Sequence, residues 1–129
     1  MTLYLDTNVP VRYFTGRPSD QFHRASRLLD EEAPLILTDV VAAEIAFVLG
    51  SVYKQDRKQV TDALQALMAR ANVHVDNPPA VLFATDIYRH TSLGFADAYL
   101  AARALLAKLG RIASFDKGID KVPGVRVEP

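Results

Sequence analysis

The stretch that decides the fold is "LYLDTNV", Leu3 to Val9, near the start of the 129-residue chain. Its first three residues form a short apolar run without a helical stripe, which is typical of a parallel strand buried on both faces. A carboxylate, Asp6, ends that run, and the polar pair Thr7 and Asn8 follows it. A charged side chain at the end of a buried strand requires either a structural or a functional reason.

Four later segments also have the composition of strands: "PLILTD" at 34–39, "NVHV" at 72–75, "RIAS" at 111–114 and "VRV" at 125–127. Helical sequence separates each of the first four strands from the next. This alternation predicts βαβ units, in which a mostly parallel sheet carries helices on both sides. We therefore expect one α/β domain over residues 1–129, built as three layers (α/β/α) around a five-stranded sheet.

Helix start signals support this division of the chain. Asp39 is placed to cap a helix that continues as "VVAAEIAFVL". Asp56 and Gln59 have the spacing of a capping box. Asn77 followed by Pro78 predicts a further helix start, because proline is favoured in the first turn.

The composition narrows the function classes. Lysine plus arginine equals aspartate plus glutamate at 15 each, so no overall basic charge indicates nucleic-acid binding. The chain has no cysteine, which excludes disulfides, thiolate nucleophiles and cysteine zinc sites and fits a reducing compartment. Neither a signal peptide, with its ~7–15-residue apolar core, nor an apolar window of ~18 residues is present, so we expect a cytoplasmic protein without a membrane segment.

Four acidic residues lie in apolar sequence, unlike the other acids of the chain. Asp6 ends the first strand, and Asp116 ends "RIASFD" after the fourth. Glu44 lies inside "VVAAEIAFVL", and Asp97 lies in "LGFADAYLAA" near a helix start. The Glu44 carboxylate is expected on the core side of its helix, because one helical face carries Val40, Glu44, Phe47 and Val48.

These four carboxylates belong at one edge of the predicted sheet. Ligands bind beyond the carboxyl ends of parallel strands, where the strand order reverses, and the carboxylates converge there if the first and fourth strands are neighbours. Such a cluster is unfavourable unless a cation neutralises it. Oxygen ligands select Mg²⁺ or Mn²⁺, ions that activate water and stabilise in-line displacement at phosphorus. The pattern therefore predicts phosphodiester hydrolysis.

Structural explanations stay open for each acid taken alone, since a cap, a turn or a favourable helix-dipole contact would account for it. A phosphoacceptor receiver domain is an alternative signalling fold with acids at its strand ends. It usually has two adjacent acids after the first strand, whereas Asp6 stands alone before Thr7. Only the joint placement of the four acids favours a metal site.

Four motifs resemble, in order, those of PIN domains, and within that family the short VapC-type toxins: "LYLDTNVPVRYFTG", "LTDVVAAEIAFVL", "GFADAYLAARA" and "IASFDKGIDKV". The resemblance implies a five-stranded parallel sheet between helices and a Mg²⁺- or Mn²⁺-dependent endoribonuclease that cleaves RNA. It also implies a homodimer of a toxin-antitoxin system, held inactive by an antitoxin whose C-terminal segment lies over the site. A catalytically silent PIN-like binding module is the alternative within this family.

The resemblance also assigns roles to residues. It implies metal ligands at Asp6, Glu44, Asp97 and Asp116, and supporting hydrogen bonds from Thr7, Asn8 and Ser114. Many relatives carry a further acid three residues before the one that matches Asp97, where this chain has Gly94. The missing carboxylate leaves open whether the site holds one or two metal ions.

Our hypothesis for the chemistry is that Asp6 and Asp97 bind one Mg²⁺ directly, with Glu44 and Asp116 completing the shell directly or through water. Basic residues that are candidates for holding the RNA backbone are Arg12, Arg17, Lys54, Arg89 and Lys117. Ordinary solvated surface charge explains each of them equally well. Because the overall charge is neutral, we expect the protein to bind RNA through a few local contacts. A structured RNA, or a loop with splayed bases, fits such binding.

Overall fold

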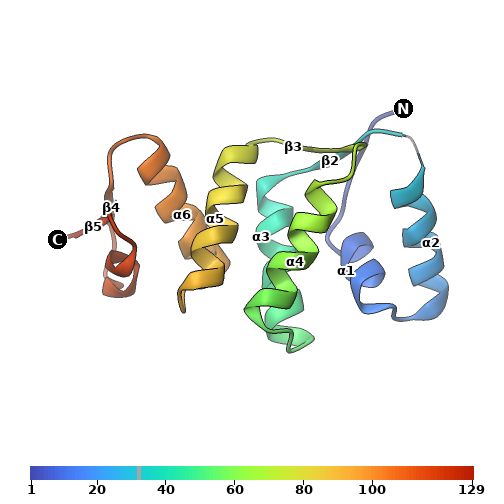
Figure 1. Ribbon diagram of the computed structural model, residues 1–129, viewed down its shortest axis with the longest axis horizontal. Coiled ribbons are helices and arrows are strands. Elements are labelled where there is room, and N and C mark those ends of the chain that lie inside the picture. The colour runs from blue at the N-terminus through green and yellow to red at the C-terminus, as the bar shows by residue number, and fades with distance from the viewer. Residues whose placement is uncertain (32) are drawn as a thin grey trace. The chain divides into compact units, whose positions relative to one another are not determined.

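The computed structural model describes residues 1–31 and 33–129, which form two compact units, residues 1–77 and 78–129 (Figure 1). Each unit has its own parallel sheet and its own buried side chains. Within the described residues, no helix is both long enough and apolar enough to cross a membrane.

The first unit contains a three-stranded parallel sheet in the order β1-β2-β3. Its elements are β1 (Leu3–Tyr4), α1 (Asn8–Thr15), α2 (Ser19–Asp30), β2 (Leu35–Leu37), α3 (Asp39–Phe47), the π-helical η1 (Val48–Val52), α4 (Arg57–Met68) and β3 (Val73–Val75). Parallel neighbours require long crossovers, and helices supply both of them, α1 with α2 and α3 with α4.

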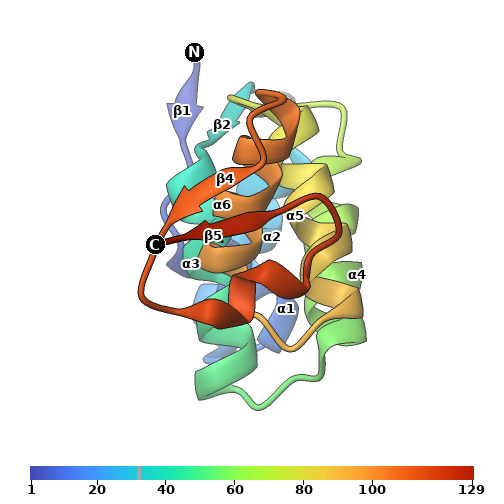
Figure 2. The same ribbon diagram turned by 90° about the vertical axis from the view of Figure 1, so that its left-hand side faces the viewer.

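The second unit pairs two helices with a two-stranded parallel sheet. Its elements are α5 (Pro78–His90), α6 (Phe95–Leu106), β4 (Arg111–Ala113), the 3₁₀ helix η2 (Lys117–Lys121) and β5 (Arg126–Glu128). Figure 2 shows β4 and β5 side by side, in the register that pairs Ile112 with Val127. The helices α5 and α6 pack together, and small side chains let them approach closely: Ala80, Ala84, Ala98, Ala101 and Ala102 are fully buried.

The core of the first unit joins its strands to its helices. The largest fully buried side chains there include Leu29, Leu35, Leu37, Ile45, Leu49, Leu64 and Leu67. At roughly 25 cal/mol per Å² of apolar surface, burial of these side chains is the main force that fixes the ends of the strands. Leu5, which directly precedes Asp6, is only 5% exposed.

The predicted α/β fold with parallel strands is confirmed, and strands occur in all five predicted segments. They are divided between a sheet of three and a sheet of two, whereas the sequence predicted one sheet of five. Each sheet is hydrogen-bonded within its own unit, for example from the Leu35 N–H to the Asn72 carbonyl and from the Ser114 N–H to the Glu128 carbonyl. That residues 1–129 form one domain stays a prediction.

The predicted helix starts are largely correct. The capping box is present, since the Gln59 N–H donates to Asp56 Oδ1 over 2.8 Å and the Asp56 N–H donates to Gln59 Oε1 over 2.9 Å. The helix α5 begins at Pro78, as predicted.

The prediction that Asp39 caps the third helix is wrong. Thr38 is the capping residue, because its extended backbone lets the hydroxyl accept from the Val41 N–H at 3.2 Å. Asp39 is the first helical residue, and its carboxylate accepts instead from the Asn77 N–H at 3.3 Å.

The predicted core face of α3 is also wrong. Val40 and Phe47 are 74% and 64% exposed, and Glu44 is exposed with them. The buried side of the helix carries Ala42, Ile45 and Ala46. Because α3 is apolar on nearly every side, its hydrophobic pattern does not determine which face lies against the core.

Candidate functional site

Asp6 is held at the exact point where β1 gives way to α1. The residues on either side of it, Leu5 and Thr7, are 5% and 6% exposed, while the Asp6 side chain is exposed. The Thr7 N–H donates to Asp6 Oδ1 over 2.9 Å. The buried neighbours fix the backbone, and this hydrogen bond orients the carboxylate.

Glu44 and Asp6 line the same cavity, although 38 positions separate them in the sequence. The cavity has a volume of about 190 Å³, and its lining residues are Asp6, Thr7, Asn8, Val11, Arg12, Glu44 and Val48. Its walls come from the start of α1 and from the end of α3 with the first residue of η1. The first unit therefore brings together two of the four predicted metal ligands.

These two carboxylates form no ion pair with any of the described residues. Neither Asp6 nor Glu44 forms an ion pair there. Arg12 lines the cavity, but its guanidinium donates to Gln21 Oε1 over 2.7 Å and to the Tyr53 hydroxyl over 3.4 Å. Neither carboxylate is thus paired with a cationic side chain, and two like charges that line one cavity favour a bound cation.

Thr7 adds a polar atom without a partner. Its hydroxyl is buried and has no hydrogen-bond partner among the described residues, although it lies in a residue that lines the cavity. A buried hydroxyl left unpaired costs about 1–3 kcal/mol, so such an atom usually bonds to water or to a ligand. Two carboxylates and a hydroxyl are all oxygen donors, and this donor set fits Mg²⁺ or Mn²⁺.

Asn8 is the first residue of α1 and is exposed. Its side chain makes no hydrogen bond to the part of the chain that the structure describes. The hydrogen bond from Thr7 to Asp6 comes from the Thr7 backbone, and neither the buried Thr7 hydroxyl nor the exposed Asn8 amide has a partner among the described residues.

Asp97 and Asp116 belong to the second unit. Asp97 lies in the first turn of α6, three residues after the capping residue Gly94, and is partly buried. Asp116 caps η2, where Oδ1 accepts from the Gly118 N–H over 2.8 Å. The Ser114 hydroxyl accepts from the Asp116 N–H over 2.9 Å, and its role at a metal site stays a prediction.

Neither unit by itself gathers three or more His, Asp or Glu side chains as a metal site among residues 1–31 and 33–129. The predicted RNA-binding residue Lys117 donates to the Pro129 carbonyl over 2.7 Å. Among the other predicted basic residues, Arg17 and Lys54 are exposed and Arg89 is partly buried. Arg12 is the one of these five that lines the cavity of Asp6 and Glu44.

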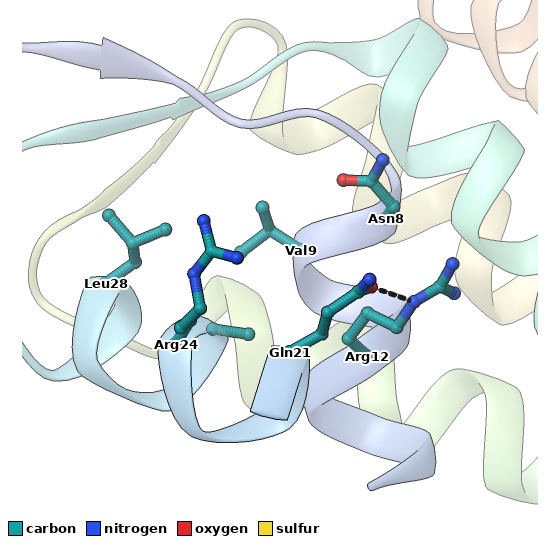
Figure 3. A pocket seen from close by; sticks show the side chains of 7 residues that line it. Asn8, Val9, Arg12, Gln21, Arg24 and Leu28 are labelled. Atoms are coloured by element: carbon teal, nitrogen blue, oxygen red, sulfur yellow. Dashed lines mark hydrogen bonds between the residues drawn. The ribbon is translucent and has the colours of Figure 1, made fainter. Parts of the chain in front are cut away.

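A second cavity adjoins the first and was not anticipated from the sequence. It has a volume of about 280 Å³ and lies between α1 and α2 (Figure 3), and its lining residues are Asn8, Val9, Arg12, Gln21, Arg24, Ala25 and Leu28. Four of these, Gln21, Arg24, Ala25 and Leu28, follow the spacing i, i+3, i+4 and i+7 on α2. That helical periodicity was the signal in the sequence that could have identified Arg24.

Comparisons with known proteins agree with the motifs. The family model described as PIN domain matches residues 3–125. No curated protein matches the chain. A solved VapBC2 complex from Rickettsia felis, bound to a DNA fragment from its promoter, contains a chain similar to this one at 15% identity, with 99% of this chain and 98% of that chain covered and a TM-score of 0.41.

A toxin-antitoxin complex from Klebsiella pneumoniae is similar at 21% identity, with 98% of this chain and 96% of that chain covered and a TM-score of 0.37. Both TM-scores are low, so the assignment rests on the family model, which spans nearly the whole sequence. PIN domains are generally nucleases, which makes a hydrolase the class of enzyme to expect. The chain belongs to the PIN domain family.

Proposed function

We propose that this chain is a cytoplasmic, metal-dependent endoribonuclease and the toxin of a VapC-type toxin-antitoxin pair. The observation that carries the proposal is the cavity that Asp6 and Glu44 line, where neither carboxylate forms an ion pair with a described residue and the Thr7 hydroxyl has no partner among those residues. Membership of the PIN family supports nuclease chemistry at this position, and it makes a receiver-like signalling domain the poorer explanation.

The proposed metal ligands are Asp6, Glu44, Asp97 and Asp116, and the proposed metal is Mg²⁺ or Mn²⁺. Asp6 and Glu44 are supported by the cavity that they share, and Asp97 and Asp116 by the sequence motifs. A divalent ion bound by these oxygens supplies Lewis-acid chemistry, which generates a nucleophile from water and stabilises negative charge at phosphorus.

The residues around the carboxylates orient the substrate and the ligands. The Thr7 N–H holds the Asp6 carboxylate in one direction through its 2.9 Å hydrogen bond. The Arg12 guanidinium lies at the same cavity and provides positive charge for a phosphodiester of the RNA backbone. The Ser114 hydroxyl fixes the Asp116 backbone by accepting a hydrogen bond from the Asp116 N–H.

The proposed partners are an antitoxin protein and a second copy of this chain. Both follow from the resemblance of the four motifs to VapC-type toxins, which act as dimers under the control of an antitoxin. An antitoxin segment that covers the carboxylates would block access of RNA to the cavity of Asp6 and Glu44.

The test is RNA cleavage by the purified protein. Cleavage is expected with Mg²⁺ or Mn²⁺ and is expected to stop with a chelator. Asp97→Asn is expected to abolish cleavage while circular dichroism shows an unchanged fold. Asp76→Asn is the control for loss of a carboxylate away from the site, because Asp76 is an exposed aspartate that follows β3 and lines neither cavity.

Equal cleavage by wild type and Asp97→Asn would overturn the assignment of Asp97. Failure of the wild-type protein to cleave any RNA with either metal would instead leave a catalytically silent binding module. Sequencing of RNA ends after expression of wild type and Asp97→Asn in a bacterium would identify the RNA that is cut.

A further inference from the structure

The cavity between α1 and α2 is positively charged and contains no carboxylate among its lining residues. Arg24 reaches into it from α2, and Arg12 lies at its edge on α1 (Figure 3). Its volume of about 280 Å³ is close to the lower limit of roughly 300 Å³ for pockets that enclose a drug-sized molecule. One nucleotide fits such a space, whereas a folded stem does not.

The two guanidinium groups are available for an anion. The Arg24 side chain has neither a hydrogen-bond nor an ion-pair partner within residues 1–31 and 33–129. The Arg12 guanidinium bonds only to neutral groups, the Gln21 amide oxygen and the Tyr53 hydroxyl. Arginine binds phosphate through charge-assisted, often bidentate hydrogen bonds, so two guanidinium groups without an anionic partner at one cavity suit a phosphate ligand.

The remaining lining suits a nucleobase. Val9, Ala25 and Leu28 present apolar surface, against which a base can lie flat. The Asn8 amide has no partner among the described residues, and amide groups form paired hydrogen bonds with base edges. The combination of apolar surface, amides and guanidinium groups matches a base together with its phosphate better than it matches phosphate alone.

The position of this cavity relates it to the proposed nuclease site. Asn8 and Arg12 line both cavities, so the two openings share a wall. An RNA strand whose phosphodiester lies at Asp6 and Glu44 therefore brings a neighbouring nucleotide to Arg24.

From these observations we propose that the cavity between α1 and α2 is a nucleotide subsite, which binds the base and phosphate of an unpaired RNA residue next to the cleaved bond. This inference rests on the proposed endoribonuclease function. It assigns Arg24 the role of a phosphate-binding residue that contributes to substrate affinity and not to the chemical step.

The binding experiment uses a pool of random-sequence tetraribonucleotides in the presence of a chelator, so that no cleavage occurs. The amide signals of Val9, Arg24 and Leu28 are expected to shift in NMR spectra of the labelled protein. Arg24→Gln is expected to weaken binding by about tenfold, the loss typical of a charge-assisted hydrogen bond. Arg27→Gln is the matched control, since Arg27 is exposed on the same helix but does not line the cavity.

The kinetic experiment uses the RNA that the wild-type protein cleaves. Arg24→Gln is expected to raise KM by about tenfold and to leave kcat within about threefold, while Arg27→Gln leaves both unchanged. Arg24 is exposed, so the Tm of Arg24→Gln is expected to equal that of the wild type. If Arg24→Gln cleaves and binds RNA as the wild type does, the proposed subsite is overturned and the proposed nuclease function is left intact.

Two competitors distinguish other occupants. Equal competition by inorganic phosphate would overturn recognition of the base. A hexaglutamate peptide that binds as tightly as RNA, with the same dependence on Arg24, would show that the cavity binds an acidic protein segment instead. RNA that binds through Arg24 but is not cleaved by the wild-type protein would give a different outcome. The nucleotide-binding site would then stand, whereas its position next to a cleaved bond would be overturned together with the proposed nuclease function.

Discussion

The Thr7 backbone N–H donates to Asp6 Oδ1 over 2.9 Å, while the buried Thr7 hydroxyl beside it has no partner among the described residues. One residue thus orients a carboxylate with its backbone and keeps a polar group unsatisfied with its side chain. This arrangement does not contribute to folding stability, because an unpaired buried hydroxyl is destabilising. The metal ion proposed for the cavity of Asp6 and Glu44 would supply the missing partner.

Thr7→Val tests this relationship, because valine has nearly the same shape and lacks the hydroxyl. Without metal, the variant is expected to be more stable than the wild type by up to about 1 kcal/mol, since an unsatisfied buried group has been removed. With saturating Mg²⁺, the stabilisation that the ion gives to the wild type is expected to shrink. Thermal unfolding with and without Mg²⁺ measures both effects.

Thr85→Val is the matched control for that substitution. Thr85 is 1% exposed, and its hydroxyl donates to the Val81 carbonyl over 2.7 Å. Its replacement is expected to cost about 0.5–1.5 kcal/mol, because a satisfied hydrogen bond is lost. If both variants are destabilised equally, the Thr7 hydroxyl has a structural partner.

Asp6→Asn is expected to leave the metal-free protein as stable as the wild type or to raise its Tm by about 1–2 °C. Asparagine keeps the acceptor for the Thr7 N–H, and the repulsion between the Asp6 and Glu44 carboxylates is relieved. Interactions between exposed charges are worth up to about 1 kcal/mol, which sets the size of this shift. A lower Tm without metal would make Asp6 a structural residue, and Asp76→Asn again serves as the control.

Acidification is expected to weaken the pairing of β4 with β5. The Arg111 side chain, which donates two hydrogen bonds to the Glu128 carboxylate over 2.7 and 2.8 Å, holds the pKa of Glu128 below its usual value. A lowered folded-state pKa means that the stabilisation is present above the unfolded pKa, about 4.3, and is lost as the pH falls through the folded value.

Glu128→Gln checks this expectation. The Tm difference between wild type and variant is expected to be measurable at pH 7, to vanish at acidic pH and to shrink in 1 M salt, because the ion pair is exposed. A difference that persists unchanged at acidic pH would show that packing of the Glu128 side chain, and not its charge, stabilises the sheet.

The capping box at the start of α4 is expected to contribute about 1 kcal/mol. Asp56→Ala removes the acceptor for the Gln59 N–H and is expected to lower the Tm by roughly 2–6 °C. Gln65→Ala, an exposed position in the same helix, is expected to have little effect, since alanine is a strong helix former. Thermal unfolding of the two variants measures the cap separately from helix propensity.

The sequence predicts features that depend on neighbouring residues. The capping box of Asp56 and Gln59 and the helix start at Pro78 are local in this sense, and both were predicted correctly. The predicted cap, Asp39, lies one residue after the observed cap, Thr38. Both residue types cap helices well, and only the backbone conformation selects between them.

Features that depend on packing were harder to predict. The face of α3 that lies against the core could not be chosen, because Val40 and Phe47 are as apolar as Ile45. Arg24 was missed for a related reason. A charged residue on a helix usually lies in solvent. The spacing of Arg24 and Leu28 places them on one face of α2, but only the cavity shows that this face lies opposite α1.

The strand β1, which ends two residues before Asp6, is short and lies at the end of the order β1-β2-β3. Two backbone hydrogen bonds, from the Leu3 N–H to the Pro34 carbonyl and from the Leu5 N–H to the Ile36 carbonyl, join this segment to its neighbour. Terminal strands open locally more often than central ones, and such an opening would displace the Asp6 carboxylate. An ion bound to Asp6 would therefore disfavour the local opening of β1. We expect such an ion to slow hydrogen exchange at the Leu3 and Leu5 amides, which lie outside the cavity.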